Sequence, residues 1–324
     1  MKNNMSDWDA KKAFTTKYLY QNNYIPQIYI DDYWNYYIEE YNLTQVWDNF
    51  LKQFKDDNLT YTSYIDEYNR LLDEVPKLLT TESDKNKIID IIDNRLNSKE
   101  NSVMPYIEDL YTLPEGNYIT VDIHSAFDEA LKYIGIFSPI YINTNDIIKD
   151  ISKHSIFNDN KRLRCDIYLH SFDEDIYYNN GLFKICSEIL LEDIYKSDQK
   201  LNDIKELTLI GKCKGDSYFY KINDNYDVTN ILGEYEHNNI KYHIDYCTVK
   251  DIIILNERYK CRFELDKNYK LRSLYLYDTN GHRVTHPFLI HLAFKLFNGG
   301  ELNEKDLAVG YEDQIFFHWD KSEI

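Results

Sequence analysis

The sequence contains few residues that break a chain or cross-link it. Only 10 of its 324 residues are glycine and only 6 are proline, which argues against long flexible linkers. The five cysteines, an odd number, include no Cys-x-x-Cys pair, so we expect neither a disulfide framework nor a zinc knuckle. Reduced thiols of this kind are typical of a cytoplasmic protein.

Long apolar runs are also missing. No window reaches the ~18 consecutive apolar residues of a membrane-spanning helix. The opening stretch, MKNNMSDWDAKK, lacks the apolar segment of a secretory signal. Hydrophobic residues make up 43% of the chain and charged residues 28%, which is typical of a globular protein. We therefore expect a soluble protein that does not bind a membrane.

Positive charge is in short supply. The chain has 37 Lys and Arg residues against 55 Asp and Glu residues, for a formal net charge of −18. This balance excludes a protein that coats nucleic acid nonspecifically, because such binding depends on neutralising phosphates. An acidic protein can still bind nucleic acid through a local basic groove or a partner subunit. Its charge can equally serve solubility alone.

Tyrosine is abundant, at 31 residues, and asparagine, isoleucine, lysine and aspartate are frequent. These residues have AT-rich codons. The gene is therefore expected to come from an AT-rich bacterium, a phage or a large virus. For a phage or viral protein, the expected location is the host cytoplasm.

The first hundred residues have helical periodicity. Trp34, Ile38, Trp47 and Phe50 belong to a series of apolar residues spaced by about three and four positions. Ser63 is a plausible helix cap. Pro76 is expected to break or kink the helix that contains it. We assign residues 1–104 to a helical N-terminal region.

A sheet with flanking helices is expected from about residue 105 onward. Residues 118–123 are expected to form a buried strand followed directly by a helix, and residues 207–222 have the pattern of a β-hairpin. Further strands are expected between 227 and 281. The sequence predicts an α+β fold in which residues 105–324 form an antiparallel sheet flanked by helices.

Two aspartates stand out within this pattern. Asp122 comes near the end of the buried strand, and Asp216 lies at the corner of the hairpin. If the two strands are neighbours in an antiparallel sheet, both carboxylates lie at the same edge. Mg²⁺ binds one or two carboxylates together with phosphate oxygens and water. Two such ions at ~4 Å form the clamp used in nucleotidyl transfer.

Two motifs resemble those of palm-type nucleic-acid polymerases. VDIHSAFDEAL resembles their first motif, where family B enzymes have Asp-x-x-Ser-hydrophobic-Tyr-Pro and reverse transcriptases have Asp-x-x-x-Ala-Phe-Asp. KGDSYFY resembles their third motif, where family B enzymes have Asp-Thr-Asp-Ser in a hairpin. The resemblance covers about residues 118–222. Two positions differ from the family B motifs. Lys214 lies before Gly215 in a hairpin where family B enzymes usually have two aspartates, and no proline follows Phe127.

This resemblance implies a palm-like domain with a defined set of site residues. Asp122 and Asp216 would be catalytic and would hold Mg²⁺ or Mn²⁺. The backbone of residues 123–126, including Ser125, would contact the triphosphate, and Phe127 would pack beneath the sugar. A nucleoside triphosphate and a nucleic-acid template would be the ligands.

A basic cluster lies between these two motifs, where the second polymerase motif is expected. In palm enzymes, this motif is a helix whose Lys or Arg binds the incoming phosphates. The candidates are Lys153, Lys161, Arg162 and Arg164. Arginine suits the role because its planar fork can donate two parallel hydrogen bonds to phosphate oxygens.

The sequence therefore predicts a divalent-metal-dependent nucleotidyltransferase, a phage or viral polymerase or one subunit of it. Structural roles remain open for each feature. Asp122 can cap the following helix, residues 215–217 can form a simple turn, and the basic cluster can be a solvated surface. The alternative is a catalytically inert, acidic viral protein that binds a host or viral protein partner.

Overall fold

The structure of the protein is a computed structural model. It describes residues 3–14, 43–79, 112–135, 143–172, 185–212, 216–223, 226–255, 257–284 and 287–303, with shorter pieces at 34, 38–39, 86–87, 90, 94, 104–105, 107, 137, 141, 182, 306, 308–311 and 314–318. Within residues 1–104, it describes helices at 3–14, 44–56 and 61–79. None of the described helices is long and apolar enough to cross a bilayer.

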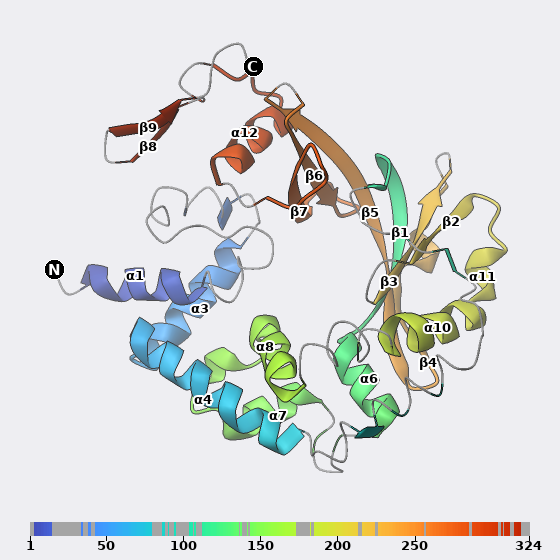
Figure 1. The fold of residues 1–324 in the computed structure, drawn as a ribbon, viewed down its shortest axis with the longest axis horizontal. Helices are drawn as coiled ribbons and strands as arrows, with labels where there is room; N and C mark the ends of the chain where they lie inside the picture. Colours follow the sequence, from blue (N-terminus) through green and yellow to red (C-terminus); the bar gives the residue numbers. More distant parts are fainter. Residues whose placement is uncertain are drawn as a thin grey trace. The chain divides into compact units, whose positions relative to one another are not determined.

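Helices and strands alternate irregularly along the chain (Figure 1). The helices are α1 (Asn3–Phe14), α3 (Thr44–Asp56), α4 (Tyr61–Leu79), α6 (Ala126–Ile134), α7 (Thr144–Ile151), η4 (Ser155–Phe157), α8 (Lys161–Ser171), η6 (Ile185–Leu190), α10 (Leu191–Ser197), α11 (Gln199–Asn202), η7 (Thr229–Ile231) and α12 (Pro287–Phe297). The strands are β1 (Gly116–Ile123), β2 (Leu207–Lys212), β3 (Ser217–Ile222), β4 (Gly233–His237), β5 (Ile240–Ile254), β6 (Tyr259–Leu265), β7 (Leu271–Asp278), β8 (Ala308–Tyr311) and β9 (Gln314–His318).

The main sheet has seven strands in the order β2-β3-β1-β5-β6-β7, and β4 pairs with β5 beside this path. The pairs β1–β3, β2–β3, β4–β5, β5–β6 and β6–β7 are all antiparallel. The antiparallel sheet, the helices that flank it and the helices that precede it confirm the predicted α+β fold.

Two compact units make up the chain, and each combines segments that are far apart in the sequence. The first contains residues 1–52, 114–116 and 248–324, and the second contains residues 53–113 and 117–247. The predicted division into residues 1–104 and 105–324 rests on the change from helical to strand patterns along the sequence, and it stays a prediction.

Aromatic side chains form the core of the first unit. Phe14 of α1 packs edge-on against Trp34, Trp47 and Phe50, with ring centroids 5.2–5.6 Å apart. In the C-terminal part of the unit, Phe263 of β6 packs edge-on against Phe294 of α12, with ring centroids 5.2 Å apart. Trp34, Trp47 and Phe50 belong to the predicted helical series, and all three rings pack on Phe14.

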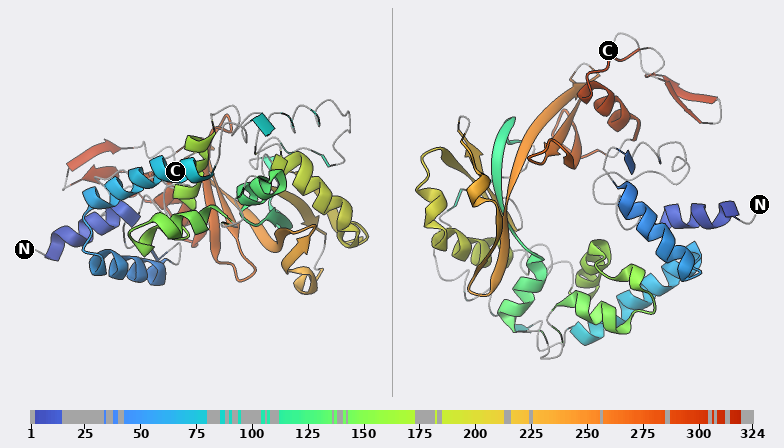
Figure 2. Two further views of the ribbon diagram at one scale, coloured as in Figure 1. Left: turned by 90° about the horizontal axis from the view of Figure 1, so that it is seen from below. Right: turned by 180° about the vertical axis from the view of Figure 1, so that it is seen from behind.

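The second unit packs helices around the ends of β1, β2 and β3. Helices α10 and α11 lie beside β2 and β3 (Figures 1 and 2), where Tyr195 of α10 packs edge-on against Tyr218 of β3. Helix α4 packs against α7 and α8. Helix α6 begins where β1 ends, as predicted.

The start and the interior of α4 differ from the sequence prediction. Thr60 is the cap, because its Oγ1 accepts a hydrogen bond from the backbone N of Ser63 at 3.1 Å. In the opposite direction, the Oγ of Ser63 accepts a hydrogen bond from the backbone N of Thr60 at 2.9 Å. This reciprocal pair is a capping box with serine in the third helical position. Pro76 does not end the helix, which continues to Leu79.

Candidate functional site

The two aspartates lie at neighbouring strand ends. In the β1–β3 pair, Asp122 lies opposite Ser217, and the backbone N of Ile123 donates to the carbonyl of Asp216 at 3.0 Å. Strict alternation along the strands would turn the Asp216 side chain away from that of Asp122. The chain bends at Asp216, one residue before β3 begins, and both residues line the same pocket.

This pocket has a volume of about 260 Å³ and belongs entirely to the second unit. It is bounded by the end of β1, the first residues of α6, one face of α8, Asp216 and one residue of β5. Six of the eight residues predicted for the site line it, namely Asp122, Ser125, Phe127, Lys161, Arg164 and Asp216. The structure thus brings the two acids and two of the four predicted cations together.

Helix α8 presents one face to the pocket. Lys161, Arg164, Cys165 and Tyr168 follow the three-and-four spacing that places side chains on the same side of a helix. Asn160 caps this helix, because its side chain accepts a hydrogen bond from the backbone N of Leu163 at 3.1 Å. Among the described residues, no carboxylate forms an ion pair with Lys161 or Arg164. Both cations thus lie on the face of α8 that lines the pocket.

The other two predicted cations lie outside the pocket. Arg162 points to a different side of α8, where its Nε donates to Asp166 Oδ2 at 2.9 Å. The same carboxylate accepts a hydrogen bond from the hydroxyl of Tyr68 at 2.6 Å. Lys153 lies beside Glu67, with Nζ 3.9 Å from Oε2. Lys153 thus contacts α4 directly, and Arg162 is linked to α4 through Asp166 and Tyr68.

The electrostatic environment of Asp216 combines burial with nearby positive charge. The residue is accessible at the pocket mouth, but the protein atoms crowded around its carboxyl raise the pKa of that group above its ordinary value. Lys161 and His243 act in the opposite direction, because their charges favour the ionised carboxylate. Burial thus disfavours the ionised form of Asp216 relative to a fully solvated aspartate, and a cation bound beside it would favour that form.

His243 is a pocket residue that the sequence analysis missed. Thr120 Oγ1 donates to the carbonyl of Asp245, and the backbone N of His124 donates to the carbonyl of Lys241, which places His243 across from Asp122. Its Nε2 lies 3.5 Å from Asp122 Oδ2 and 3.4 Å from Asp245 Oδ2. Alternation along β5 places His243 and Asp245 on the same face of the strand. It does not show that Asp122 of β1 lies opposite them.

The turn between β1 and α6 has a left-handed residue. Ser125 has φ 50° and ψ 54° and is the N-cap of α6, without a side-chain capping bond. The alternative role of Asp122 as the helix cap is therefore wrong. This backbone conformation costs about 1–2 kcal/mol for a residue other than glycine, and it lets α6 begin at the pocket. The positive end of the helix dipole there favours an anionic group.

A buried carboxylate ties together the helices around the pocket. Asp128 of α6 is only 3% exposed. Its Oδ1 accepts hydrogen bonds from the backbone N and the hydroxyl of Thr144 and from the hydroxyl of Tyr168, at 3.0, 2.7 and 2.8 Å. Because these residues belong to α6, α7 and α8, one side chain fixes the helices that carry Phe127 and Arg164.

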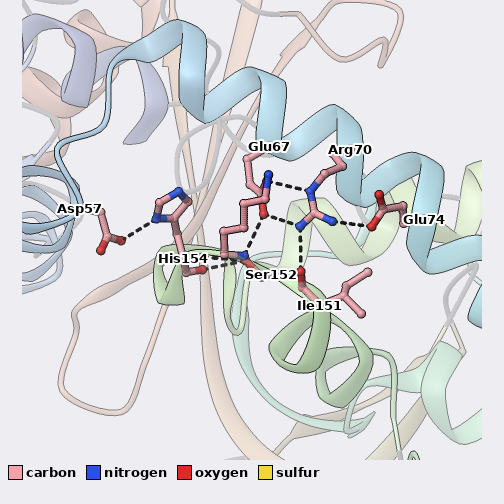
Figure 3. A network of polar contacts seen from close by, with 8 residues as sticks. Asp57, Glu67, Arg70, Glu74, Ile151, Ser152 and His154 are labelled. Atoms are coloured by element: carbon pink, nitrogen blue, oxygen red, sulfur yellow. Dashed lines mark hydrogen bonds and ion pairs between the residues drawn. The ribbon is translucent and has the colours of Figure 1, made fainter.

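A second network fixes the segment that leads into α8 (Figure 3). Glu67 of α4 accepts hydrogen bonds from the Arg70 side chain and from the backbone N of Lys153, and Arg70 also donates to the carbonyl of Ile151. Burial alone would raise the pKa of Glu67, but these bonds and the two nearby positive charges outweigh it and hold the pKa below its ordinary value. The chain between α7 and α8 is thus anchored on α4, where His154 Nδ1 also lies 3.4 Å from Asp57 Oδ2.

A buried ion pair supports the hairpin that leads to Asp216. Lys212, near the end of β2, is 4% exposed, and its Nζ donates to Glu192 Oε1 at 2.9 Å and to the carbonyl of Ser187 at 3.0 Å. Ser187 belongs to the π-helix η6, a geometry that is found often at functional sites. In the same segment, the thiol of Cys186 donates to the carbonyl of Ala126 at the start of α6. Residues 213–215, in the corner of the hairpin, lie outside the described part of the chain.

The donor set fits a metal ion only in part. Within the described ranges, no group of three or more His, Cys, Asp or Glu side chains could hold a metal by itself. Asp122 and Asp216 offer two carboxylates, and Mg²⁺ commonly binds one or two carboxylates with phosphate oxygens and water completing its octahedron. The residues therefore fit an ion that arrives with a phosphate ligand, while the two-ion clamp stays a prediction.

Comparison of the chain with protein-family models, curated proteins and solved structures returned no match. The resemblance to palm-type polymerases therefore stays a prediction that rests on the motifs.

Proposed function

We propose that the protein is a divalent-metal-dependent nucleotidyltransferase with a palm-like site, and that it acts as a phage or viral polymerase or as a subunit of one. The observation that carries the proposal is the shared pocket of Asp122, Asp216, Lys161 and Arg164. These residues come from three separate parts of the chain. The two acids suit a divalent cation, and the two cations suit phosphates.

In this proposal, each side chain has a defined role. Asp122 and Asp216 hold Mg²⁺ or Mn²⁺, which supplies charge neutralisation and alignment for phosphoryl chemistry. Arg164 and Lys161 bind phosphate oxygens from α8, and the first backbone N–H groups of α6 bind them from the other side. Phe127 lines the same pocket beside these groups, where the motif resemblance puts the sugar.

The negative net charge of the chain limits how it could bind a nucleic-acid template. With a net charge of −18, the chain has little general affinity for a nucleic-acid template. The proposal therefore includes a second, more basic protein subunit that would hold the template. The alternative is a catalytically inert protein that binds another protein. In that case the arginines of α8 should pair with nearby acids, as Arg162 does with Asp166.

Replacement of Arg164 by Ala tests the proposal against that alternative. A charge-assisted hydrogen bond contributes about 1.5–3 kcal/mol. Its loss should weaken binding of a nucleoside triphosphate by roughly 10–100-fold. The measurement is calorimetric titration of the purified full-length chain with ATP in Mn²⁺.

Arg162→Ala is the matched control, because it removes the same side chain two positions away on the same helix. Arg162 pairs with Asp166 outside the pocket, so this variant should bind ATP as the unmodified protein does. Equal affinities for both variants and the unmodified protein would remove α8 from the site. If the unmodified protein binds no nucleotide in Mg²⁺ or Mn²⁺, the proposed function loses its support.

A further inference from the structure

Strand β4 forms an edge of the main sheet. It is joined to β5 by a tight hairpin whose corner residues, Asn238 and Asn239, have φ values of 50° and 64°. Two left-handed residues in succession are typical of a type I′ turn, which matches the twist of an antiparallel strand pair. Among the described strands, only β5 pairs with β4, so the other side of β4 is an edge of the sheet.

The register of the hairpin shows which backbone groups point away from β5. The pair next to the two-residue turn, at His237, exchanges hydrogen bonds between the strands, and bonded and non-bonded pairs alternate from there. The N–H and C=O groups of Glu236 and Glu234 therefore point outward. Lys241, opposite Glu236, agrees with this alternation, because its carbonyl accepts a hydrogen bond from the backbone N of His124 on the β1 side at 2.9 Å.

This edge is open to solvent. Four of the five residues of β4 are exposed, and His237 is half-buried. Side chains alternate along the strand, so Glu234 and Glu236 lie on one face and Tyr235 on the other. Tyr235 stacks on Tyr242 of β5, with ring centroids 5.5 Å apart, and this contact ties β4 to its neighbour. An extended peptide can add to such an edge through backbone hydrogen bonds.

The side chains of β4 select the charge of an added strand. Opposite charges on neighbouring strands stabilise the pair, and like charges directly opposite destabilise it. Lys or Arg opposite Glu234 and Glu236 would thus be favoured, and so would a β-branched residue opposite Tyr235. A second copy of β4, added antiparallel, would place glutamates opposite glutamates. The net charge of −18 also favours a basic partner over a second copy.

We propose that β4 binds an extended segment of another protein by strand addition, and that this segment has Lys or Arg at alternate positions. Its backbone would exchange hydrogen bonds with Glu234 and Glu236, and its basic side chains would lie beside their carboxylates. None of the residues of β4 lines the pocket. The inference therefore needs neither nucleotide nor metal and does not depend on the proposed function.

Fluorescence anisotropy with the labelled peptide Lys-Val-Lys-Val-Lys-Val-Lys, in the absence of nucleotide and metal, tests the inference. We expect this peptide to bind the full-length chain with a Kd below about 1 mM. The matched control peptide has a methyl group on the backbone nitrogen of each lysine, which keeps the charge and removes the donors. It should bind at least about tenfold more weakly. Equal affinities would show attraction by net charge alone and would overturn the inference, as would the absence of binding by both peptides.

Two double variants locate the contact on the protein. Glu234→Lys with Glu236→Lys should weaken binding of the unmethylated peptide at least about tenfold, because attraction is replaced by repulsion. Asp203→Lys with Glu206→Lys is the control, since both residues are exposed and the net charge changes equally. The control should bind within about threefold of the unmodified protein. Equal losses in the two double variants would overturn the inference.

Glu236→Pro tests the backbone contact separately. The N–H group of Glu236 points away from β5, so proline removes an outward donor and leaves the ladder with β5 intact. The Tm should change by only a few degrees, and the peptide should bind at least about tenfold more weakly. An unchanged affinity would overturn the inference. Sedimentation tests the other occupant, because a dimer that Glu236→Pro converts to a monomer would show that a second copy adds to β4, which would also overturn it.

Discussion

Asp216→Asn is expected to reduce ATP binding in Mn²⁺ to the level measured without metal. The substitution keeps the shape of the side chain and removes one of the two carboxylates available to the ion. In the unmodified protein, added Mn²⁺ should strengthen ATP binding, because in the proposed site the ion would join the carboxylates to the phosphates. In the variant, that gain should disappear. Titrations of both proteins with and without Mn²⁺ measure the difference.

The same variant should be more stable than the unmodified protein in metal-free buffer. Burial raises the pKa of Asp216, so at any pH above its ordinary value the ionised carboxylate destabilises the folded state relative to the unfolded state. Asparagine removes that charge, and the Tm should rise. Asp203→Asn is the control, because Asp203 is exposed outside the pocket and the variant changes net charge equally. A Tm that falls by many degrees would instead identify Asp216 as a structural turn residue.

Lys212→Met is expected to destabilise the protein by about 3–5 kcal/mol, because it leaves the buried Glu192 without its counterion. The pair is enclosed, with side chains that are 5% and 8% exposed. The substitution also removes the hydrogen bond to the carbonyl of Ser187 in the π-helix. Denaturant unfolding, followed by circular dichroism, measures the loss.

Two further variants separate charge burial from packing. The double variant Lys212→Met with Glu192→Leu should recover most of the stability, since an apolar pair of similar volume often replaces a buried ion pair at little cost. Lys295→Met, at an ion pair with Asp306 in which the lysine is 29% exposed, should cost about 1 kcal/mol or less. If Lys212→Met costs no more than Lys295→Met, Lys212 does not support the hairpin.

Local pattern was enough to predict the elements around the site. The strand ending near Asp122, the helix after it and the hairpin at 207–222 each combine a clear apolar period with a turn signal. The cap of α4 was misplaced by three residues, because Thr60 and Ser63 are chemically alike and exchange hydrogen bonds. Pro76 was expected to disrupt a helix that continues for three more residues.

The sequence predicts only some of the residues that line the pocket. Helical spacing alone separates Lys161 and Arg164 from Arg162, because a side chain one position along lies about 100° around the helix. His243 could not be found in this way. Its contact with Asp122 depends on the register of two strands that are about 120 positions apart in the sequence.

Protection of Cys165 from alkylation tests the central claim most directly, because this thiol lines the same pocket as Lys161 and Arg164. The other cysteines of the described ranges, Cys186, Cys247 and Cys261, are buried. Cys213 lies outside those ranges and is replaced by serine. Burial raises the pKa of the Cys165 thiol, so its reactive thiolate grows with pH and an alkaline buffer is required.

Iodoacetamide is the alkylating reagent, and peptide mass spectrometry measures the rate at which it modifies Cys165. We predict that ATP with Mn²⁺, at about ten times its Kd, slows alkylation of Cys165 roughly tenfold, because about nine sites in ten are then occupied. Adenosine with Mn²⁺ should give no protection. An alkylation rate that does not change at saturating ATP and Mn²⁺ would contradict the account, since it would show that nucleotide does not enter this pocket.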